Sequence, residues 1–192
     1  MKLVIATQNK GKLKEYQALL GEFYEVVSTA DVGFFKDVEE TGKTFAENSY
    51  LKAKAVYDFC KLPSLADDSG LSVDALDGAP GVNSARYSGE HGNDRKNYLL
   101  LLKNMQGVKN RKANFQTAIT LITEEKTYTA TGVVYGEILL SPEGKNGFGY
   151  DPVFFSYDLQ KSFGVAEDEE KNKVSHRARA TANLLNQLKN ND

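Results

Sequence analysis

Two adjacent carboxylates, Asp67 and Asp68, open the segment Asp-Asp-Ser-Gly at residues 67–70. The apolar pair Leu65 and Ala66 precedes them, so we expect a short strand that ends at the carboxylates. Successive side chains of a strand point to opposite faces, so the two acids should do different jobs. One can bind a metal or activate water, and the other can support the loop. Taken alone, however, Asp-Ser-Gly is common turn chemistry and favours an ordinary turn.

A second candidate site is the segment Thr-Gln-Asn-Lys-Gly-Lys, which joins a predicted strand to a predicted helix. Free backbone N–H groups and the positive end of the helix dipole favour anions at such a junction. The segment offers polar donors, a glycine that allows close backbone approach, and positive charge: Thr7, Gln8, Asn9, Lys10, Gly11 and Lys12. An Asn-containing turn with solvated lysines accounts for the same residues equally well.

Further polar residues lie between these two segments. Glu39 and Glu40 offer hard oxygen ligands of the kind that magnesium takes alongside substrate phosphates. Asn48 and Lys52 are four residues apart in a predicted helix, so they share a face and can point together at an anionic ligand. Exposed acids and a solvated helix face are the simpler explanation when each pair is taken alone.

A glycine-flanked loop at residues 147–152 carries two aromatic side chains, Phe148 and Tyr150. This is poor placement for a core and good placement for stacking on a nucleobase. Weak edge packing or a dimer contact is the alternative. Hydrogen-bond donors follow near the start of the last predicted helix, where an ordinary surface histidine is equally expected: Lys171, His176 and Arg177.

The elements that must position these residues follow from the apolar periodicity. Strands are predicted at residues 3–6, 24–28, 65–66, 115–121, 128–140 and 153–155, and helices at 12–23, 45–59, 93–105 and 175–189. Thr44 and Glu47 match a capping box at the start of the second helix. The charged stretch 167–173 is expected to precede the closing helix. Strands and helices alternate at first and the later strands favour antiparallel pairing, which predicts a mixed α/β sheet.

Composition limits the classes of function. The length of 192 residues fits one domain, which can have two lobes, and the formal net charge of −2 argues against gripping a nucleic-acid backbone. Cys60 is the single cysteine, so neither an intrachain disulfide nor a Cys-based zinc site within one chain is expected. No apolar run approaches the ~20 residues of a membrane span. We therefore expect a cytoplasmic protein with no membrane or nucleic-acid partner.

The order of these blocks along the chain resembles the inosine/xanthosine triphosphate pyrophosphatases, a family of house-cleaning nucleotide hydrolases. The resemblance runs from Leu3 to the last helix. It rests on blocks that occur in one continuous order: Thr-x-Asn-x-x-Lys, Glu-Glu-Thr-Gly-x-Thr-Phe-x-Glu-Asn, Ala-Asp-Asp-Ser-Gly-Leu, Gly-x-Pro-Gly-x-x-Ser-Ala-Arg-Tyr-Ser-Gly, Gly-Phe-Gly-Tyr-Asp-Pro-x-Phe-Phe and Ser-His-Arg. The chain departs from the family at Gln8, where many members have Gly, and over residues 162–168.

The resemblance implies hydrolysis of ITP, dITP and XTP to the nucleoside monophosphate and pyrophosphate. It implies a homodimer that depends on Mg2+, with Mn2+ as a substitute. It also implies an α/β fold with a mixed, elongated twisted sheet and flanking helices. Residues 1–192 would form a single domain of two lobes with a central substrate cleft.

Site roles carry over by position. Asp68 would activate water and bind metal, and Glu39 would be the second metal ligand, although the neighbouring Glu40 stays open as the alternative. Lys52 would contact phosphate and Ser69 the substrate, while the segment Thr7, Gln8, Asn9, Lys10, Gly11 and Lys12 would contact the triphosphate. The base-binding set would be Phe148, Gly149, Tyr150, Asp151, Lys171, His176 and Arg177.

Other classes of function remain to be separated by experiment. One is a pyrophosphatase for a pyrimidine or modified base on a related fold, and another is a catalytically silent module that senses inosine nucleotides. The intact acidic set argues against the silent module. A purely structural α/β protein leaves the co-occurring polar loops unexplained.

Overall fold

The computed structural model describes residues 1–190, and its strands and helices alternate along the chain. The strands are β1 (Lys2–Ile5), β2 (Glu25–Ser28), β3 (Ser64–Val73), β4 (Lys112–Ile122), β5 (Thr127–Ile138), β6 (Phe154–Ser156) and β7 (Lys161–Ser162). The α-helices are α1 (Lys10–Leu20), α2 (Phe45–Cys60), α3 (Asp94–Asn104), α4 (Asp168–Val174) and α5 (His176–Lys189). Over this part of the chain, no helix combines the length and apolarity needed to cross a membrane.

Hydrogen bonding joins the strands in the order β2-β1-β3-β4-β5-β6-β7. β1 pairs in parallel with β2 and β3, whereas β6 pairs in antiparallel with β5 and β7. The predicted mixed α/β sheet with flanking helices is therefore confirmed.

The chain divides into two compact units. Unit 1 consists of Met1–Asp68, Thr117–Gly132 and the described residues from Arg177 onward, and unit 2 consists of Ser69–Gln116 and Val133–His176. Strands β3, β4 and β5 contribute residues to both units. Each unit has its own hydrophobic core.

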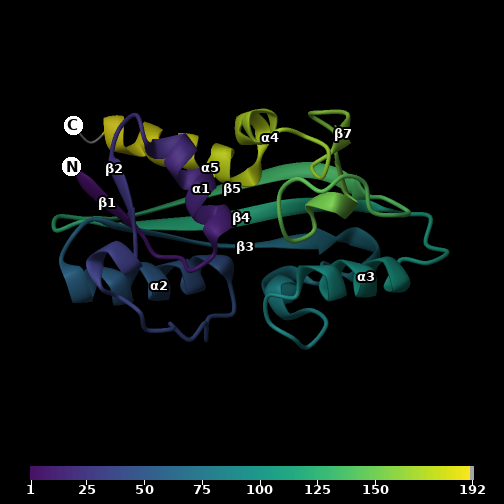
Figure 1. The fold of residues 1–192 in the computed structure, drawn as a ribbon, viewed down its shortest axis with the longest axis horizontal. Helices are drawn as coiled ribbons and strands as arrows, with labels where there is room; N and C mark the ends of the chain where they lie inside the picture. The colour runs from purple at the N-terminus through teal and green to yellow at the C-terminus, as the bar shows by residue number, and fades with distance from the viewer. Residues whose placement is uncertain (191–192) are drawn as a thin grey trace. The chain divides into compact units, whose positions relative to one another are not determined.

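In unit 1, α1 and α5 cover one face of the sheet and α2 covers the other (Figure 1). The alternation of side chains along β1 serves both faces. Leu3 and Ile5 pack in the cluster that includes α1 and α5, whereas Val4 packs in the cluster that includes α2. Helix α2 begins with the predicted capping box, in which the Thr44 hydroxyl accepts from Glu47 N and the Glu47 carboxylate accepts from Thr44 N.

In unit 2, the core is rich in phenylalanine. Phe115 of β4 lies with its ring centroid 4.7 Å from that of Phe154, and Phe154 lies 5.2 Å from Phe163. Leu101 and Met105, from α3 and its C-terminal cap, belong to the same buried cluster.

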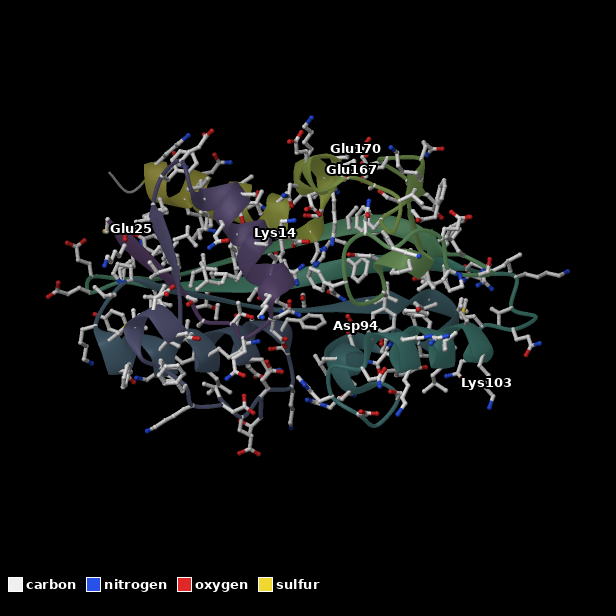
Figure 2. The ribbon with its side chains drawn as sticks, in the orientation of Figure 1. Lys14, Glu25, Asp94, Lys103, Glu167 and Glu170 are labelled. Carbon is white, nitrogen blue, oxygen red and sulfur yellow. The ribbon has the colours of Figure 1, made fainter. Side chains whose placement is uncertain are left out.

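The charged stretch at 167–173 precedes the closing helix as predicted, and it forms most of a further helix, α4, that the periodicity did not indicate. Glu167 and Glu170, labelled in Figure 2, explain its start because they form a reciprocal capping box. The Glu170 carboxylate accepts a hydrogen bond from Glu167 N at 3.0 Å. The closing helix α5 follows as a separate element.

The prediction of a short strand ending at the carboxylates is wrong. β3 continues through Asp67 and Asp68 to Val73, so both acids lie inside a strand. Gly70 allows this extended path, because a Cβ atom there would lie 2.2 Å from the carbonyl oxygen of Gly81. Partners on both faces of the strand compensate the two charges and outweigh the local preference of Asp-Ser-Gly for a turn.

Candidate active site

Asp67 and Asp68 are adjacent in β3, and both side chains are buried. Because successive side chains of a strand point to opposite faces, the two carboxylates meet different helices. The partners of Asp67 come from α1 and α5 and those of Asp68 come from α2: Lys12 and Arg177 for the first, Asn48 and Lys52 for the second. The prediction that the two acids do different jobs therefore has a structural basis.

Asp67 is held between two cations. Lys12 Nζ lies 3.1 Å from its Oδ1, and Arg177 Nε donates to its Oδ2 at 2.9 Å. Burial raises the pKa of Asp67, but the charges of Lys12 and Arg177 outweigh this effect and hold the pKa well below its usual range. Asp67 is thus an ionised support for its cationic neighbours at neutral pH.

Asp68 has the opposite electrostatic character. Asn48 Nδ2 donates to its Oδ2 at 3.0 Å, and Lys52 Nζ lies 3.6 Å from its Oδ1. Burial raises the pKa of Asp68 more than the charge of Lys52 lowers it, and the nearby carboxylate of Glu40 raises it further. A buried carboxylate with a raised pKa is suited to general base catalysis.

The acidic segment brings Glu40, rather than Glu39, to this cluster. Glu40 Oε1 lies 2.6 Å from Lys52 Nζ, whereas the side chain of Glu39 is exposed. Residues 34–42 form neither helix nor strand, so no periodicity in the sequence distinguishes the two glutamates. The structure therefore favours Glu40 over the expected Glu39 as the partner of Asp68.

The N-terminal segment is more helical than expected. Asn9 caps α1 by accepting from Lys12 N at 3.0 Å, and Thr7 Oγ1 accepts from Asn9 N at 3.1 Å. As a consequence, Lys10, Gly11 and Lys12 lie in the first helical turn and not in a loop. Gln8, Asn9 and Lys10 are exposed, so of this segment only Lys12 is seen to contact the buried carboxylates.

In unit 2, the aromatic loop is organised by Asp151. This buried carboxylate accepts from Phe148 N at 2.8 Å and forms an ion pair with the buried Lys171. Lys171 Nζ also lies 4.7 Å from the centroid of the Phe148 ring, in a cation–π contact. The structure thus brings together Phe148, Asp151 and Lys171, three residues that the resemblance places in one set.

The two aromatic residues of the loop have different surroundings. Phe148 is half-buried, but Tyr150 belongs to the unit 2 core and its hydroxyl donates to the Ser84 carbonyl at 2.7 Å. The interpretation that both rings are poor core residues is therefore wrong for Tyr150. Its glycine neighbours suggested an exposed loop, yet the phenolic O–H finds a buried acceptor.

His176 and Arg177 are adjacent in sequence but belong to different clusters. In unit 2, the imidazole of His176 is buried and stacks on Phe115, with centroids 5.1 Å apart. In unit 1, the guanidinium of Arg177 is 2% exposed and also donates to Glu15 Oε2 at 3.0 Å. The structure thus surrounds Arg177 with carboxylates, although the resemblance places it in the base-binding set. Ser69 is a half-buried residue of β3.

Sequence reasoning missed Asp94 and the full role of Asn48. Asp94, labelled in Figure 2 at the start of α3, accepts from Gly149 N at 2.8 Å and so holds the aromatic loop. An acid in the first turn of a helix is already explained by its favourable interaction with the helix dipole. The sequence therefore offered no reason to expect a second, long-range contact of Asp94. Asn48 was expected to point at a ligand with Lys52, but its amide contacts Asp68.

The carboxylates near Lys52 are candidate ligands for a divalent cation. Among residues 1–190, no three Asp, Glu, His or Cys side chains gather closely enough to hold a metal ion by themselves. Asp68 and Glu40, however, both approach Lys52 Nζ, so their oxygens stabilise positive charge at one position. Magnesium is often bound by one or two carboxylates together with water and substrate phosphates, so this pair fits it.

Comparisons with known proteins identify the family of the chain. The sequence profile of the Ham1 family matches residues 3–187. Proteins named dITP/XTP pyrophosphatase from Bacillus licheniformis and Geobacter sulfurreducens are 46% and 48% identical to the chain; the alignments cover 95% and 97% of this chain and 95% and 96% of theirs. The Ham1 protein of Staphylococcus aureus matches with a TM-score of 0.87 at 37% identity over 100% of both chains. A HAM1 protein from Coxiella burnetii matches with 0.87 at 38% over 99% of both. The chain belongs to the Ham1 family.

Proposed function

We propose that this protein hydrolyses ITP, dITP and XTP to the nucleoside monophosphate and pyrophosphate, and so removes them from the nucleotide pool. The observation that carries the proposal is the environment of Asp68, a buried carboxylate with a raised pKa beside Lys52 and Glu40. The relatives named dITP/XTP pyrophosphatase support the choice of substrate.

In unit 1, the chain supplies a base and positive charge. Asp68 orients the attacking water and accepts its proton, a role that suits a carboxylate whose pKa is raised by burial. Lys52 and Lys12 add positive charge for the phosphates. Asp67 keeps Lys12 in place through the 3.1 Å ion pair and does not itself contact substrate in this proposal.

We assign the metal site to Asp68 and Glu40 and the metal to Mg2+, with Mn2+ as a substitute. These two carboxylates would hold the cation, which would supply positive charge to the phosphate oxygens and the leaving pyrophosphate. The 2.6 Å contact of Glu40 with Lys52, together with the exposure of Glu39, supports Glu40 as the second ligand.

In unit 2, Phe148 supplies a partly exposed ring for stacking on the base. Asp151 accepts a hydrogen bond from the Phe148 backbone, and Lys171 contacts the ring, so both restrain its position. Hypoxanthine and xanthine carry an acceptor at C6, where adenine carries an amino donor. Donors such as Lys171 and His176 therefore favour the first two bases, since the amino group of adenine would present a donor to them in place of an acceptor. Guanine shares the C6 oxygen, so rejection of GTP must depend on contacts around C2.

The substrate assignment is tested by kcat/KM values for ITP, dITP, XTP, GTP, ATP and a pyrimidine triphosphate in the presence of Mg2+. We expect the first three to exceed ATP by about 10²-fold or more. An equal kcat/KM for ATP, or a higher one for the pyrimidine triphosphate, would point instead to a pyrophosphatase with a different base preference. Tight binding of ITP without turnover would identify a silent nucleotide sensor.

Assembly and location complete the proposal. We propose a homodimer, on the resemblance to the pyrophosphatase family, and a cytoplasmic location, which suits a chain with a single cysteine. Sedimentation velocity at micromolar concentration tests the first point, because a monomer at that concentration would contradict it.

A further inference from the structure

The side chain of Asn48 connects Asp68 with the acidic segment of unit 1. It lies in the first part of α2 and is 1% exposed. Its Nδ2 donates to Asp68 Oδ2 at 3.0 Å, and its Oδ1 accepts from the backbone N–H of Gly42 at 2.8 Å. One amide thus contacts both the proposed catalytic carboxylate and the segment that carries Glu40.

The chemistry of the two neighbours determines which way this amide faces. A backbone N–H can only donate and an ionised carboxylate can only accept, so the carbonyl end must face Gly42 and the NH2 end must face Asp68. Asn is the side chain that offers both ends at this length. The fit is close, because a Cβ atom on Gly42 would lie 2.6 Å from Asn48 Oδ1.

Asn48 and Lys52 approach different carboxylate oxygens of Asp68. Oδ2 is engaged by the amide, while Oδ1 faces Lys52 Nζ at 3.6 Å. Lys52 in turn contacts Glu40, two residues before Gly42. The two ends of Asn48 therefore restrain the two carboxylates that we assign to the metal.

We propose that Asn48 is a positioning residue for the reaction. It fixes the rotamer of Asp68 and the distance between Asp68 and the Glu40 segment. This inference rests on the proposed function and deepens it, because it explains how two acids from distant parts of the sequence are held near each other. Groups that orient metal ligands in this way typically affect metal affinity or activity by about 10- to 100-fold.

Two substitutions distinguish the contact of the Asn48 amide with Gly42 from its contact with Asp68. Asn48→Ala removes both contacts, whereas the isosteric Asn48→Asp keeps an acceptor for Gly42 N–H and removes the donor to Asp68. The matched control is Ser49→Ala, because Ser49 is the next residue of α2, is fully buried, and bonds instead to Thr120 Oγ1 at 2.8 Å. All variants are first compared with the wild type by urea unfolding.

We expect kcat for ITP to fall by about 10- to 100-fold in both Asn48 variants, with a much smaller change in KM. Ser49→Ala should keep its kcat even if it loses stability. In Asn48→Ala, the Mg2+ concentration for half-maximal rate should rise by about tenfold. Binding of Mn2+ to the substrate-free protein, followed by the loss of the free-ion EPR signal, should weaken in the same variant.

The inference is overturned if both Asn48 variants show the kcat and the half-activating Mg2+ concentration of Ser49→Ala, because Asn48 is then only a satisfied buried amide. Asp68→Asn in the same assays distinguishes a failure of the proposed function from a failure of the Asn48 inference. Full turnover in Asp68→Asn would reject the proposed function. Loss of turnover in Asp68→Asn with no effect at Asn48 would reject this inference alone.

Discussion

Arg177 Nε donates a hydrogen bond to Asp67 Oδ2 at 2.9 Å, and both side chains are almost completely buried. The same guanidinium reaches Glu15 through Nη1, so it joins α5, α1 and β3 within unit 1. A cation with two carboxylate partners is held in place by strong charge-assisted hydrogen bonds. Arg177 therefore stabilises the strand segment from which Asp68 projects.

Removing Arg177 should destabilise the protein. In Arg177→Ala, Asp67 and Glu15 lose their shared cation, and breaking a buried ion pair in this way costs about 3–5 kcal/mol. Urea unfolding measures the loss, and Arg179→Ala, a half-buried arginine on the same helix, should lose much less. Wild-type stability combined with a narrowed ITP-to-ATP preference in Arg177→Ala would instead favour the base-binding role that the resemblance implies.

The adjacent carboxylates should respond oppositely to replacement by asparagine. The pKa of Asp67 is lowered on folding, so its stabilising contribution is present above the unfolded pKa of about 3.9 and is lost as pH falls below it. Asp67→Asn should therefore lower Tm at pH 7, with a smaller difference from the wild type in acid.

The pKa of Asp68 is raised on folding, so its contribution is present below the unfolded pKa and is lost as pH rises through the folded one. Asp68→Asn should therefore raise Tm at pH 7 while abolishing turnover, a trade of stability for activity. Thermal unfolding of both variants between pH 3 and 8 checks the pair. Equal shifts of the same sign would show that the two environments do not differ in this way.

Local signals in the sequence were sufficient to predict several features of this structure. The capping box of Thr44 and Glu47 predicts the start of α2 because all its atoms lie within one turn. The alternation along β3 predicts that Asp67 and Asp68 face opposite ways, even though the strand is longer than expected. Such features depend on neighbours in sequence, so sequence reasoning reaches them.

Contacts between distant segments could not be predicted in the same way. Glu40 and Glu39 are chemically identical and lie in a segment without periodicity, so only the position of Lys52 distinguishes them. Arg177 is 110 residues from Asp67, and its position at a helix start indicated an accessible donor rather than a buried partner. Tyr150 likewise depends on Ser84, which lies 66 residues away.

The two neighbouring glutamates provide a matched test of the metal site. Glu40→Gln should raise the Mg2+ concentration for half-maximal activity by about tenfold or more, because it removes a charged ligand of the proposed site. Glu39→Gln changes an exposed side chain and should leave the Mg2+ dependence near that of the wild type. The reverse result would restore Glu39 as the ligand.

Asp94 should act on substrate affinity. When the Asp94 carboxylate is removed, Gly149 N loses the 2.8 Å hydrogen bond that holds the loop of Phe148. Asp94→Ala should raise KM for ITP by about 2- to 10-fold, the equivalent of one hydrogen bond of ~0.5–1.5 kcal/mol, with little change in kcat. Glu90→Ala, which removes an exposed ion pair with Lys96, is the control and should leave KM unchanged. Identical KM values in the two variants would exclude a role for Asp94.

The identity of the phosphate products tests the central claim most directly. ITP is incubated with the protein and Mg2+, and the products are assigned by 31P NMR, with Asp68→Asn as the control. We predict pyrophosphate and IMP from the wild type and no product from Asp68→Asn. Orthophosphate and IDP, or full turnover by Asp68→Asn, would contradict the account.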